Sequence, residues 1–247
     1  AGMADAGHRR ALAWSASPYS SYSSCRQYSE DLEAAREASG VTAPQVKWIR
    51  RHHDHPGLIQ PAADRLAEAL DRLPTNRRQD AVLAFSAHSI PTTMATGCRY
   101  EAEVAEVARL VAEQVDPAGN HRREVVWQSR SGPSGVPWLE PDVVDRIRTM
   151  AAEGVDAVAV SPIGFPVENF EIVWDLDVEA AQAAEEYGMA FVRARTVDDD
   201  SRFVTMVADL VVERTRPAVG KRAALGLLGL APDTCPADCC LPPPNNR

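Results

Sequence analysis

His88 is the residue whose type and position most clearly suggest chemistry. It follows the apolar run that opens the stretch Ala81–Pro91, AVLAFSAHSIP. A short apolar run between turn residues is typical of a buried strand in a parallel sheet. His88 would then lie just past the carboxyl end of the strand, at the edge where open α/β sheets bind ligands. An imidazole there can accept a proton or bind a divalent metal ion, and a hydrogen-bonded structural histidine is the alternative.

Three carboxylates on a later helix are the candidate partners of His88. Glu171, Asp175 and Glu179 are spaced four residues apart, which places them on one face of a helix expected over 168–187. A buried strand and a Pro/Gly turn precede this helix, so we expect its N-terminus at the binding edge of the sheet. A row of oxygen ligands suits a hydrated divalent cation, and a solvated acidic face is the alternative. We expect His88 and these carboxylates to face one another across a cleft.

Cysteines form a second constellation. Cys235, Cys239 and Cys240 lie in one short window near the C-terminus, and Cys25 lies far upstream after a predicted strand. Four thiols are the number that a 2Fe–2S cluster or a structural zinc ion needs. The spacing differs from the usual CxxC, so an untethered Cys-rich tail is the alternative. Cys98, in a predicted loop, is expected to be an ordinary free thiol.

Two other segments contain residues that could bind ligands. The run Arg51–His55 holds three histidines and an aspartate. We expect a solvated loop there rather than a metal site, because neighbouring residues of an extended chain point in different directions. The Gly/Pro-rich loop over 129–141 contains Trp138, which we expect to anchor the loop, with stacking on a flat ligand as the alternative. The sequence contains no GxGxxG or Walker motif, so nothing supports a nucleotide site.

Strands and helices alternate along the chain in an order that would position these residues. The alternation predicts a doubly wound α/β sheet with right-handed crossovers. We expect a first α/β half-domain over 1–78, a second over 79–214 with the metal site, and a Pro/Cys-rich tail over 215–247. Strands are expected at 10–17, 45–49, 81–86, 124–128, 156–163 and 189–194, and helices at 25–38, 61–73, 100–116, 142–153, 168–187 and 201–214.

Composition argues against several classes of protein. The net charge of −9, without a basic stripe, argues against a nucleic-acid partner. The longest apolar runs have the length of strands, so we expect no membrane-spanning segment. The N-terminal residues lack the apolar segment of an export signal. We therefore expect a reducing, cytoplasmic location, and cysteines that are free or metal-bound rather than paired in disulfides.

Three motifs in combination resemble ferrochelatase, the enzyme that inserts ferrous iron into a porphyrin. They are FSAHSIP (Phe85–Pro91), WQSRSGPSGVPWLEPDV (Trp127–Val143) and SPIGFPVENFEIVWDLD (Ser161–Asp177), and the resemblance extends over about residues 5–214. The segment SPYSSYSSCRQYSEDL and the CPADCC tail resemble the actinobacterial branch of the family. That branch binds a 2Fe–2S cluster and converts coproporphyrin III to coproheme in heme biosynthesis.

The resemblance implies two Rossmann-like halves of the chelatase type, the first incomplete because relatives carry a longer N-terminal portion. Fe²⁺ and a porphyrin would be the substrates, and a later enzyme of heme synthesis the protein partner. In the family the helix of the metal-site glutamate is locally widened. The implied roles are active-site histidine for His88, essential metal-site glutamate for Glu171, continuation of the acidic metal line for Asp175 and Glu179, and cluster ligands for Cys25, Cys235, Cys239 and Cys240.

The sequence also departs from the family. Glu168 and Asn169 stand where relatives carry an Asp-His pair, which alters a polar contact close to Glu171. Two alternative functions stay open: a non-catalytic porphyrin or iron–sulfur binding remnant, and a sister chelatase that inserts cobalt or nickel into a sirohydrochlorin-type ring. That sister group usually relies on more than one active-site histidine, and only His88 is well placed here.

Overall fold

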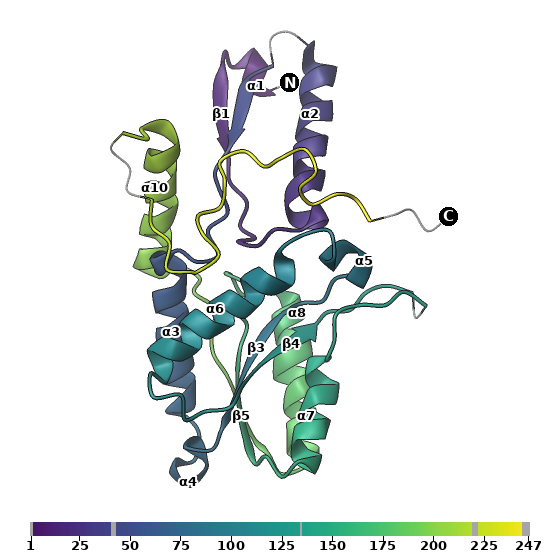
Figure 1. The fold of residues 1–247 in the computed structure, drawn as a ribbon, viewed down its shortest axis with the longest axis vertical. Coiled ribbons are helices and arrows are strands. Elements are labelled where there is room, and N and C mark those ends of the chain that lie inside the picture. Colours follow the sequence, from purple (N-terminus) through teal and green to yellow (C-terminus); the bar gives the residue numbers. More distant parts are fainter. Residues whose placement is uncertain (1, 41–42, 134, 219–221, 244–247) are drawn as a thin grey trace.

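The computed structural model describes residues 2–40, 43–133, 135–218 and 222–243, and within them the strands form two parallel sheets (Figure 1). The smaller sheet, at the top of the view, pairs β1 (Arg10–Ala13) with β2 (Gln45–Trp48). The larger sheet has the strand order β4–β3–β5–β6. Its strands are β3 (Val82–His88), β4 (Arg123–Gln128), β5 (Ala157–Ser161) and β6 (Ala190–Arg193). The predicted α/β class with parallel sheets is therefore confirmed.

The strand order of the larger sheet contains a switch point between β3 and β5. From β3 the chain goes to β4 on one side and then crosses to β5 on the other side of β3. Loops that leave two such strands diverge, so a crevice opens at their carboxyl ends. His88 ends β3, and the turn after β5 leads to Glu171. The topology therefore brings both residues to one crevice.

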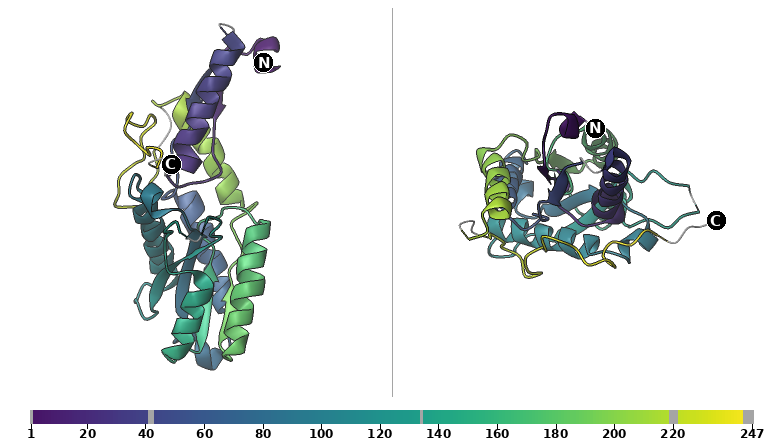
Figure 2. Two further views of the ribbon diagram at one scale, coloured as in Figure 1. Left: turned by 90° about the vertical axis from the view of Figure 1, so that its right-hand side faces the viewer. Right: turned by 90° about the horizontal axis from the view of Figure 1, so that it is seen from above.

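Helices cover both faces of the larger sheet, and the whole molecule is elongated, with the smaller sheet and α2 at one end (Figure 2). The side chains of β3 alternate between two cores. Leu83 and Phe85 pack with α3 and α6, whereas Val82 and Ala84 pack with α7 and the helix of Glu171. The α-helices of six or more residues are α2 (Gln27–Ser39), α3 (Pro56–Leu70), α6 (Tyr100–Val115), α7 (Val143–Ala152), α9 (Ala181–Glu186) and α10 (Ser201–Thr215).

Other helical segments complete the fold. Within the described ranges, two of these segments are π-helical, with i→i+5 hydrogen bonds, a form that is rare and is often found at functional sites. These are η1 (Tyr22–Arg26), which contains Cys25, and η3 (Val173–Ala180), which lies between α8 (Phe170–Ile172) and α9. The others are α1 (Gly2–Asp5), α4 (Thr75–Arg78) and α5 (Thr92–Ala95). No helix among the described residues is long and apolar enough to cross a membrane.

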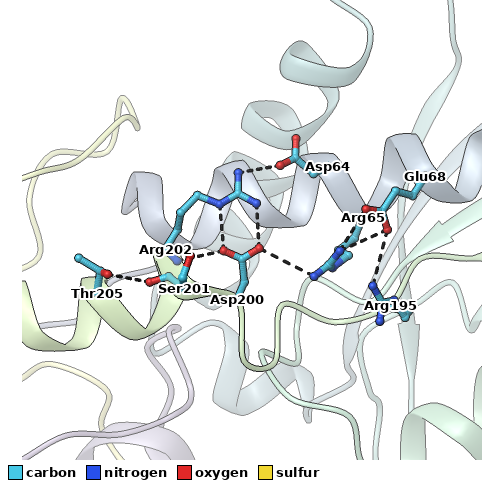
Figure 3. A network of polar contacts seen from close by, with 8 residues as sticks. All are labelled: Asp64, Arg65, Glu68, Arg195, Asp200, Ser201, Arg202 and Thr205. Carbon is cyan, nitrogen blue, oxygen red and sulfur yellow. Dashed lines mark hydrogen bonds and ion pairs between the residues drawn. The ribbon is translucent and has the colours of Figure 1, made fainter.

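The last helix, α10, packs against α3 in the first part of the chain. Figure 3 shows the polar contacts between them: Asp200, the N-cap of α10, accepts hydrogen bonds from Arg202 and pairs with Arg65, while Arg202 also pairs with Asp64 at 2.6 Å. The apolar part of the contact is a third core cluster, which contains Ile49, Leu58, Val197, Phe203, Met206 and Leu210.

The predicted division into 1–78, 79–214 and 215–247 stays a prediction. Both α3 and α10 make contacts across the proposed boundary at residue 78, because α3 packs against β5 and β6 of the larger sheet as well as against α10.

The start of α3 differs from the sequence-based expectation. The helix begins at Pro56 rather than Pro61, which lies inside it. His55 is the N-cap, because its Nδ1 accepts a hydrogen bond from the backbone N–H of Gly57 at 3.0 Å. A proline at the first helical position has no N–H to leave unpaired, so Pro56 suits the start of the helix.

The expectation of a solvated loop at Arg51–His55 is wrong. His52, His53, Asp54 and His55 are all buried. The ring of His52 stacks on Trp14 with centroids 5.7 Å apart, and the ring of His53 stacks on Tyr19 at 6.4 Å. The segment is covered by the C-terminal tail, whose Leu225 donates a backbone hydrogen bond to the carbonyl of Asp54. Local sequence could not reveal this cover, because the tail is distant in the chain.

The burial of His52 predicts a loss of stability in acid. Desolvation, with smaller contributions from neighbouring cationic groups, lowers the pKa of His52 to about 3. In the unfolded chain the imidazole of His52 has an ordinary pKa of about 6.5, so it becomes protonated at a pH at which the folded protein keeps it neutral. The free energy of unfolding therefore falls as the pH drops from about 6.5 towards 3. Between about pH 7 and pH 5 the expected loss is about 2 kcal/mol in the free energy of unfolding.

Chemical denaturation at several pH values would test this expectation. The variant His52→Phe keeps a flat ring against Trp14. In this variant the slope of the unfolding free energy against pH should be smaller by the equivalent of about one proton taken up on unfolding. The exposed His8 offers the matched control, because His8→Phe should leave the slope unchanged. An unchanged slope in His52→Phe would contradict the prediction.

Candidate active site

His88 is held at the end of β3 by contacts of its backbone and of one ring nitrogen. The hydroxyl of buried Tyr100 donates to the carbonyl of His88 at 2.8 Å. The ring Nδ1 lies 2.5 Å from the carbonyl of Ser89, an acceptor, which assigns the ring proton to Nδ1. In the neutral form of the ring, Nε2 then carries the lone pair, and Nε2 is the nitrogen that faces Glu171.

Glu171 faces this nitrogen from the first turn of α8. Its Oε2 lies 3.9 Å from Nε2 of His88, and about half of the Glu171 side chain is exposed. The turn is capped by Asn169, whose Oδ1 accepts from the backbone N–H of Ile172 at 3.0 Å. Ile172 itself is fully buried, so the opposite side of the helix is anchored in the core. The two side chains that sequence reasoning paired therefore meet at one edge of the sheet.

The other two predicted carboxylates continue along π-helix η3. Asp175 is half-buried, and it accepts hydrogen bonds from Gln128 at 3.2 Å and from the hydroxyl of Ser129. Glu179 is exposed further along the helix. Among the described residues, no three His, Cys, Asp or Glu side chains are arranged to hold a metal ion. The carboxylates thus form a line that leads away from His88 rather than one coordination sphere.

A glycine allows the turn after β5 to approach the end of β3 closely. Gly164 donates its N–H to the carbonyl of Ser86 at 3.0 Å. A Cβ atom at this position would lie 2.5 Å from Cα of Ala87, so any larger residue would push the turn away. The next residue, Phe165, places its ring centroid 6.4 Å from that of His88. The close approach therefore sets an aromatic wall beside the imidazole.

A cavity of about 710 Å³ opens beside His88. One wall comes from the segment over 16–24, which follows β1, and the other from the turn over 164–169. Trp138 lines the same cavity, and its ring also packs against Gly132, where a Cβ would lie 2.6 Å away. The hydroxyl-bearing residues of the first wall are Ser17, Tyr19, Ser21, Ser23 and Ser24, of which Tyr19 and Ser24 donate to backbone carbonyls of the protein.

Sequence reasoning missed this hydroxyl-bearing wall and Phe165. A usable signal was present, because the SPYSSYSS segment directly follows a predicted strand, and the residues after a parallel strand lie at the ligand-binding edge.

The four predicted cluster ligands also come together. Cys25, in π-helix η1, is buried, and its free thiol is hydrogen-bonded to the free thiols of Cys235 and Cys240, while Sγ of Cys239 lies 3.5 Å from Sγ of Cys240. Hydrogen bonds from Cys235 and Cys240, and the nearby Arg51, hold the pKa of the Cys25 thiol well below its ordinary value. Cys98 is separate from them in its bonding and donates to the carbonyl of Met94.

Two arginines join this cluster of thiols to the rest of the chain. Nε of Arg51 lies 3.1 Å from Sγ of Cys25. Arg26 donates to the carbonyl groups of Ala237 and Cys239, which fastens the tail to η1. Figure 1 shows the yellow tail passing beside the lower end of α2. A second cavity, of about 580 Å³, lies against these cysteines.

A comparison of the sequence with models of protein families identifies the family of this chain. The model of the ferrochelatase family matches residues 1–215. The chain belongs to the ferrochelatase family. The resemblance inferred from the three sequence motifs is therefore confirmed, and with it the chelatase-type arrangement of Rossmann-like halves.

Curated relatives of this ferrochelatase-family chain are named coproporphyrin III ferrochelatase. The relative from Streptomyces griseus subsp. griseus is 43% identical, with 96% of this chain and 68% of the relative covered. The relative from Nocardia farcinica is also 43% identical, over 97% of this chain and 70% of its own length. That from Mycolicibacterium vanbaalenii is 45% identical, over 92% and 67%. The chain thus spans about two thirds of the length of these relatives.

A solved structure supports the fold of this family member independently. SirB from Bacillus subtilis with Fe³⁺ superposes with a TM-score of 0.57 over 90% of this chain and 78% of that chain. The sequence identity is only 9%, so the likeness concerns the fold alone.

Proposed function

We propose that this chain inserts ferrous iron into coproporphyrin III to give coproheme. The observation that carries the proposal is the 3.9 Å approach of Glu171 Oε2 to Nε2 of His88, a residue that lines the cavity. Membership of the ferrochelatase family supports the reaction, and the names of the curated relatives support this porphyrin. The volume of about 710 Å³ is within the usual range of small-molecule sites.

The chemistry of the insertion fits the two side chains. Iron enters the ring as Fe²⁺ and two pyrrole N–H protons leave, so the reaction needs proton acceptors but neither ATP nor a redox step. The lone pair of His88 Nε2 and the carboxylate of Glu171 can each accept a proton or guide the iron as it sheds water. The rings of Phe165 and Trp138 can pack on the macrocycle and hold it in a non-planar shape.

The line of carboxylates beyond Glu171 is proposed as the route of the hydrated metal ion. Asp175 and Glu179 follow Glu171 along the π-helix, and oxygen ligands suit a divalent cation that still carries water. The hydroxyl group of Ser17, on the segment over 16–24, can donate a hydrogen bond to a carboxylate of coproporphyrin III.

We also propose that Cys25, Cys235, Cys239 and Cys240 bind a 2Fe–2S cluster. The donor set fits in number and type, since four thiolates are what such a cluster requires. The neighbouring Arg51 favours the thiolate form of Cys25, whereas hydrogen bonds to Cys25 raise the pKa of Cys235 and Cys240, so those two thiols would lose their protons as the cluster binds. The four sulfurs now contact one another, so they would have to move apart to receive the cluster. When bound, the cluster would supply a site that can store one electron, and it would link η1 to the tail.

Two further properties of the protein stay predictions from the sequence. These are the cytoplasmic location and a later enzyme of heme synthesis as the protein that receives the product.

An insertion assay separates the proposal from its alternatives. The purified chain would be incubated anaerobically with Fe²⁺ and coproporphyrin III while the porphyrin absorption bands are followed. Conversion to the spectrum of coproheme is the expected result. Binding of the porphyrin without conversion would favour the non-catalytic remnant. Insertion of Co²⁺ or Ni²⁺ into a sirohydrochlorin-type ring, without conversion of coproporphyrin III, would favour the sister chelatase.

A further inference from the structure

Arg193, the last residue of β6, holds two carboxylates on either side of Glu171. Its Nη1 donates to Oε1 of Glu168 at 2.8 Å, three residues before Glu171. Its Nε and Nη2 donate to the two carboxylate oxygens of Asp177 at 2.6 and 2.8 Å, six residues after Glu171. The Arg193 side chain is only 14% exposed, and paired guanidinium–carboxylate bonds of this kind define a direction as well as a distance.

The segment that follows Arg193 holds the loop before the site helix in three more places. The backbone N–H of Thr196 donates to the Glu168 carboxylate at 3.1 Å. The side chain of Asp198 accepts from the backbone N–H of Glu168 at 3.0 Å, and its own N–H donates to the carbonyl of Pro166. Arg193, Thr196 and Asp198 therefore fix the loop over 166–168 through hydrogen bonds to Pro166 and Glu168.

The position of Glu171 depends on these contacts of its neighbours, because its own carboxylate makes no short hydrogen bond among the described residues. Within the described chain, its polar partner is His88 at 3.9 Å, and the side chain is about half exposed. Its helix also continues into the π-helix η3, whose i→i+5 bonding is a rare register. If the helix shifted to ordinary α-helical bonding, the residues along it would rotate relative to His88. Asp177 lies inside η3, so its pair with Arg193 resists that shift.

We propose that Arg193 is a positioning residue that sets the register of η3 and thereby places Glu171 opposite His88. Glu168, which accepts hydrogen bonds from both Arg193 and the backbone of Thr196, is the second residue through which Arg193 acts. The proposal rests on the proposed function only in treating His88 and Glu171 as the metal-handling pair. It predicts that Arg193 controls the affinity of that pair for a divalent metal ion without touching the ion.

Mn²⁺ alone is a suitable probe, because it prefers carboxylate and imidazole ligands to the cysteine thiols of the tail. Its binding to the full chain would be measured by EPR of the free ion, and the site defined as the binding that Glu171→Gln abolishes. Arg193→Ala and Arg193→Lys should each weaken this binding by about ten-fold or more, as loss of an orienting partner typically does. Lysine keeps the charge and much of the length but cannot bond both carboxylates as a planar fork.

Arg195 offers the matched control. It lies two residues further along the same segment, it is mostly exposed, and it pairs with Glu68 of α3 at 3.8 Å (Figure 3). Arg195→Ala should leave Mn²⁺ affinity within about two-fold of the parent. Thermal unfolding of all variants would be recorded alongside, since a merely structural role would lower the melting temperature without changing the metal affinity of the folded protein.

Two results would overturn the proposal. One is Mn²⁺ affinity within about two-fold of the parent in Arg193→Lys and in folded Arg193→Ala. The other is a parent chain with no Mn²⁺ binding that depends on Glu171. The insertion assay judges the proposed function separately: a chain that loses metal affinity in Arg193→Lys but converts no porphyrin supports the positioning role and refutes the iron-insertion activity.

Discussion

Replacing Glu171 by glutamine should lower kcat for iron insertion by about 10²- to 10⁴-fold, the range that a positioned proton-transfer group contributes. Glutamine keeps the size and the hydrogen-bonding capacity of the side chain, but it can neither accept a proton nor carry the negative charge that favours a cation. Because Glu171 lies on the surface of α8, with its neighbour Ile172 in the core, the substitution should leave the fold intact. Stopped-time assays with coproporphyrin III and Fe²⁺ would measure the change.

The partner of Glu171 should behave in the same way. His88→Ala should cause a loss of similar size, and the double variant should lose little more than either single one, because residues that act as a unit are not additive. Glu186→Gln, an exposed glutamate on α9, is the control and should retain parental activity. Activity within about three-fold of the parent in Glu171→Gln would contradict the proposed mechanism.

Replacing Cys25 by serine should abolish the visible colour of the purified protein. The proposed cluster needs four thiolates, and Cys25 is the ligand that joins the tail cysteines to η1. Without it, the tail should also become more sensitive to proteolysis, since Arg26 would be its main remaining polar attachment to η1. Visible absorption, the iron and acid-labile sulfide content, and limited proteolysis would measure the two effects. Cys239→Ser should give the same loss of colour.

Cys98 supplies the control for the cluster prediction. Its thiol bonds to a backbone carbonyl and takes no part in the cysteine group, so Cys98→Ser should keep the colour. A parent protein that is colourless and contains zinc would contradict the 2Fe–2S assignment and favour a structural zinc site. Colour that persists in Cys25→Ser would show that Cys25 is not a ligand.

Much of the scaffold could be predicted because local sequence controls it. The apolar run before His88 and the alternation of strands with helices are short-range patterns, and they predicted β3, the parallel sheets and the edge at which His88 lies. The four-residue spacing of Glu171, Asp175 and Glu179 predicted a shared helical face. Even so, the start of α3 was misplaced, because the cap supplied by His55 is a side-chain contact that the pattern of apolar residues does not reveal.

Sequence alone determined that this chain is an α/β protein of the ferrochelatase family, with an imidazole and a line of carboxylates at one edge of a sheet. Only the tertiary structure decided that the histidines at 52–55 are buried, that hydroxyl groups after β1 line the cavity, and that Arg193 braces the helix of Glu171. These features depend on contacts between residues far apart in the chain. The spacing of apolar and polar residues reflects hydrogen bonds between residues that are close in the sequence. Contacts between distant residues depend on how helices and strands pack, and that packing can be seen only in the folded structure.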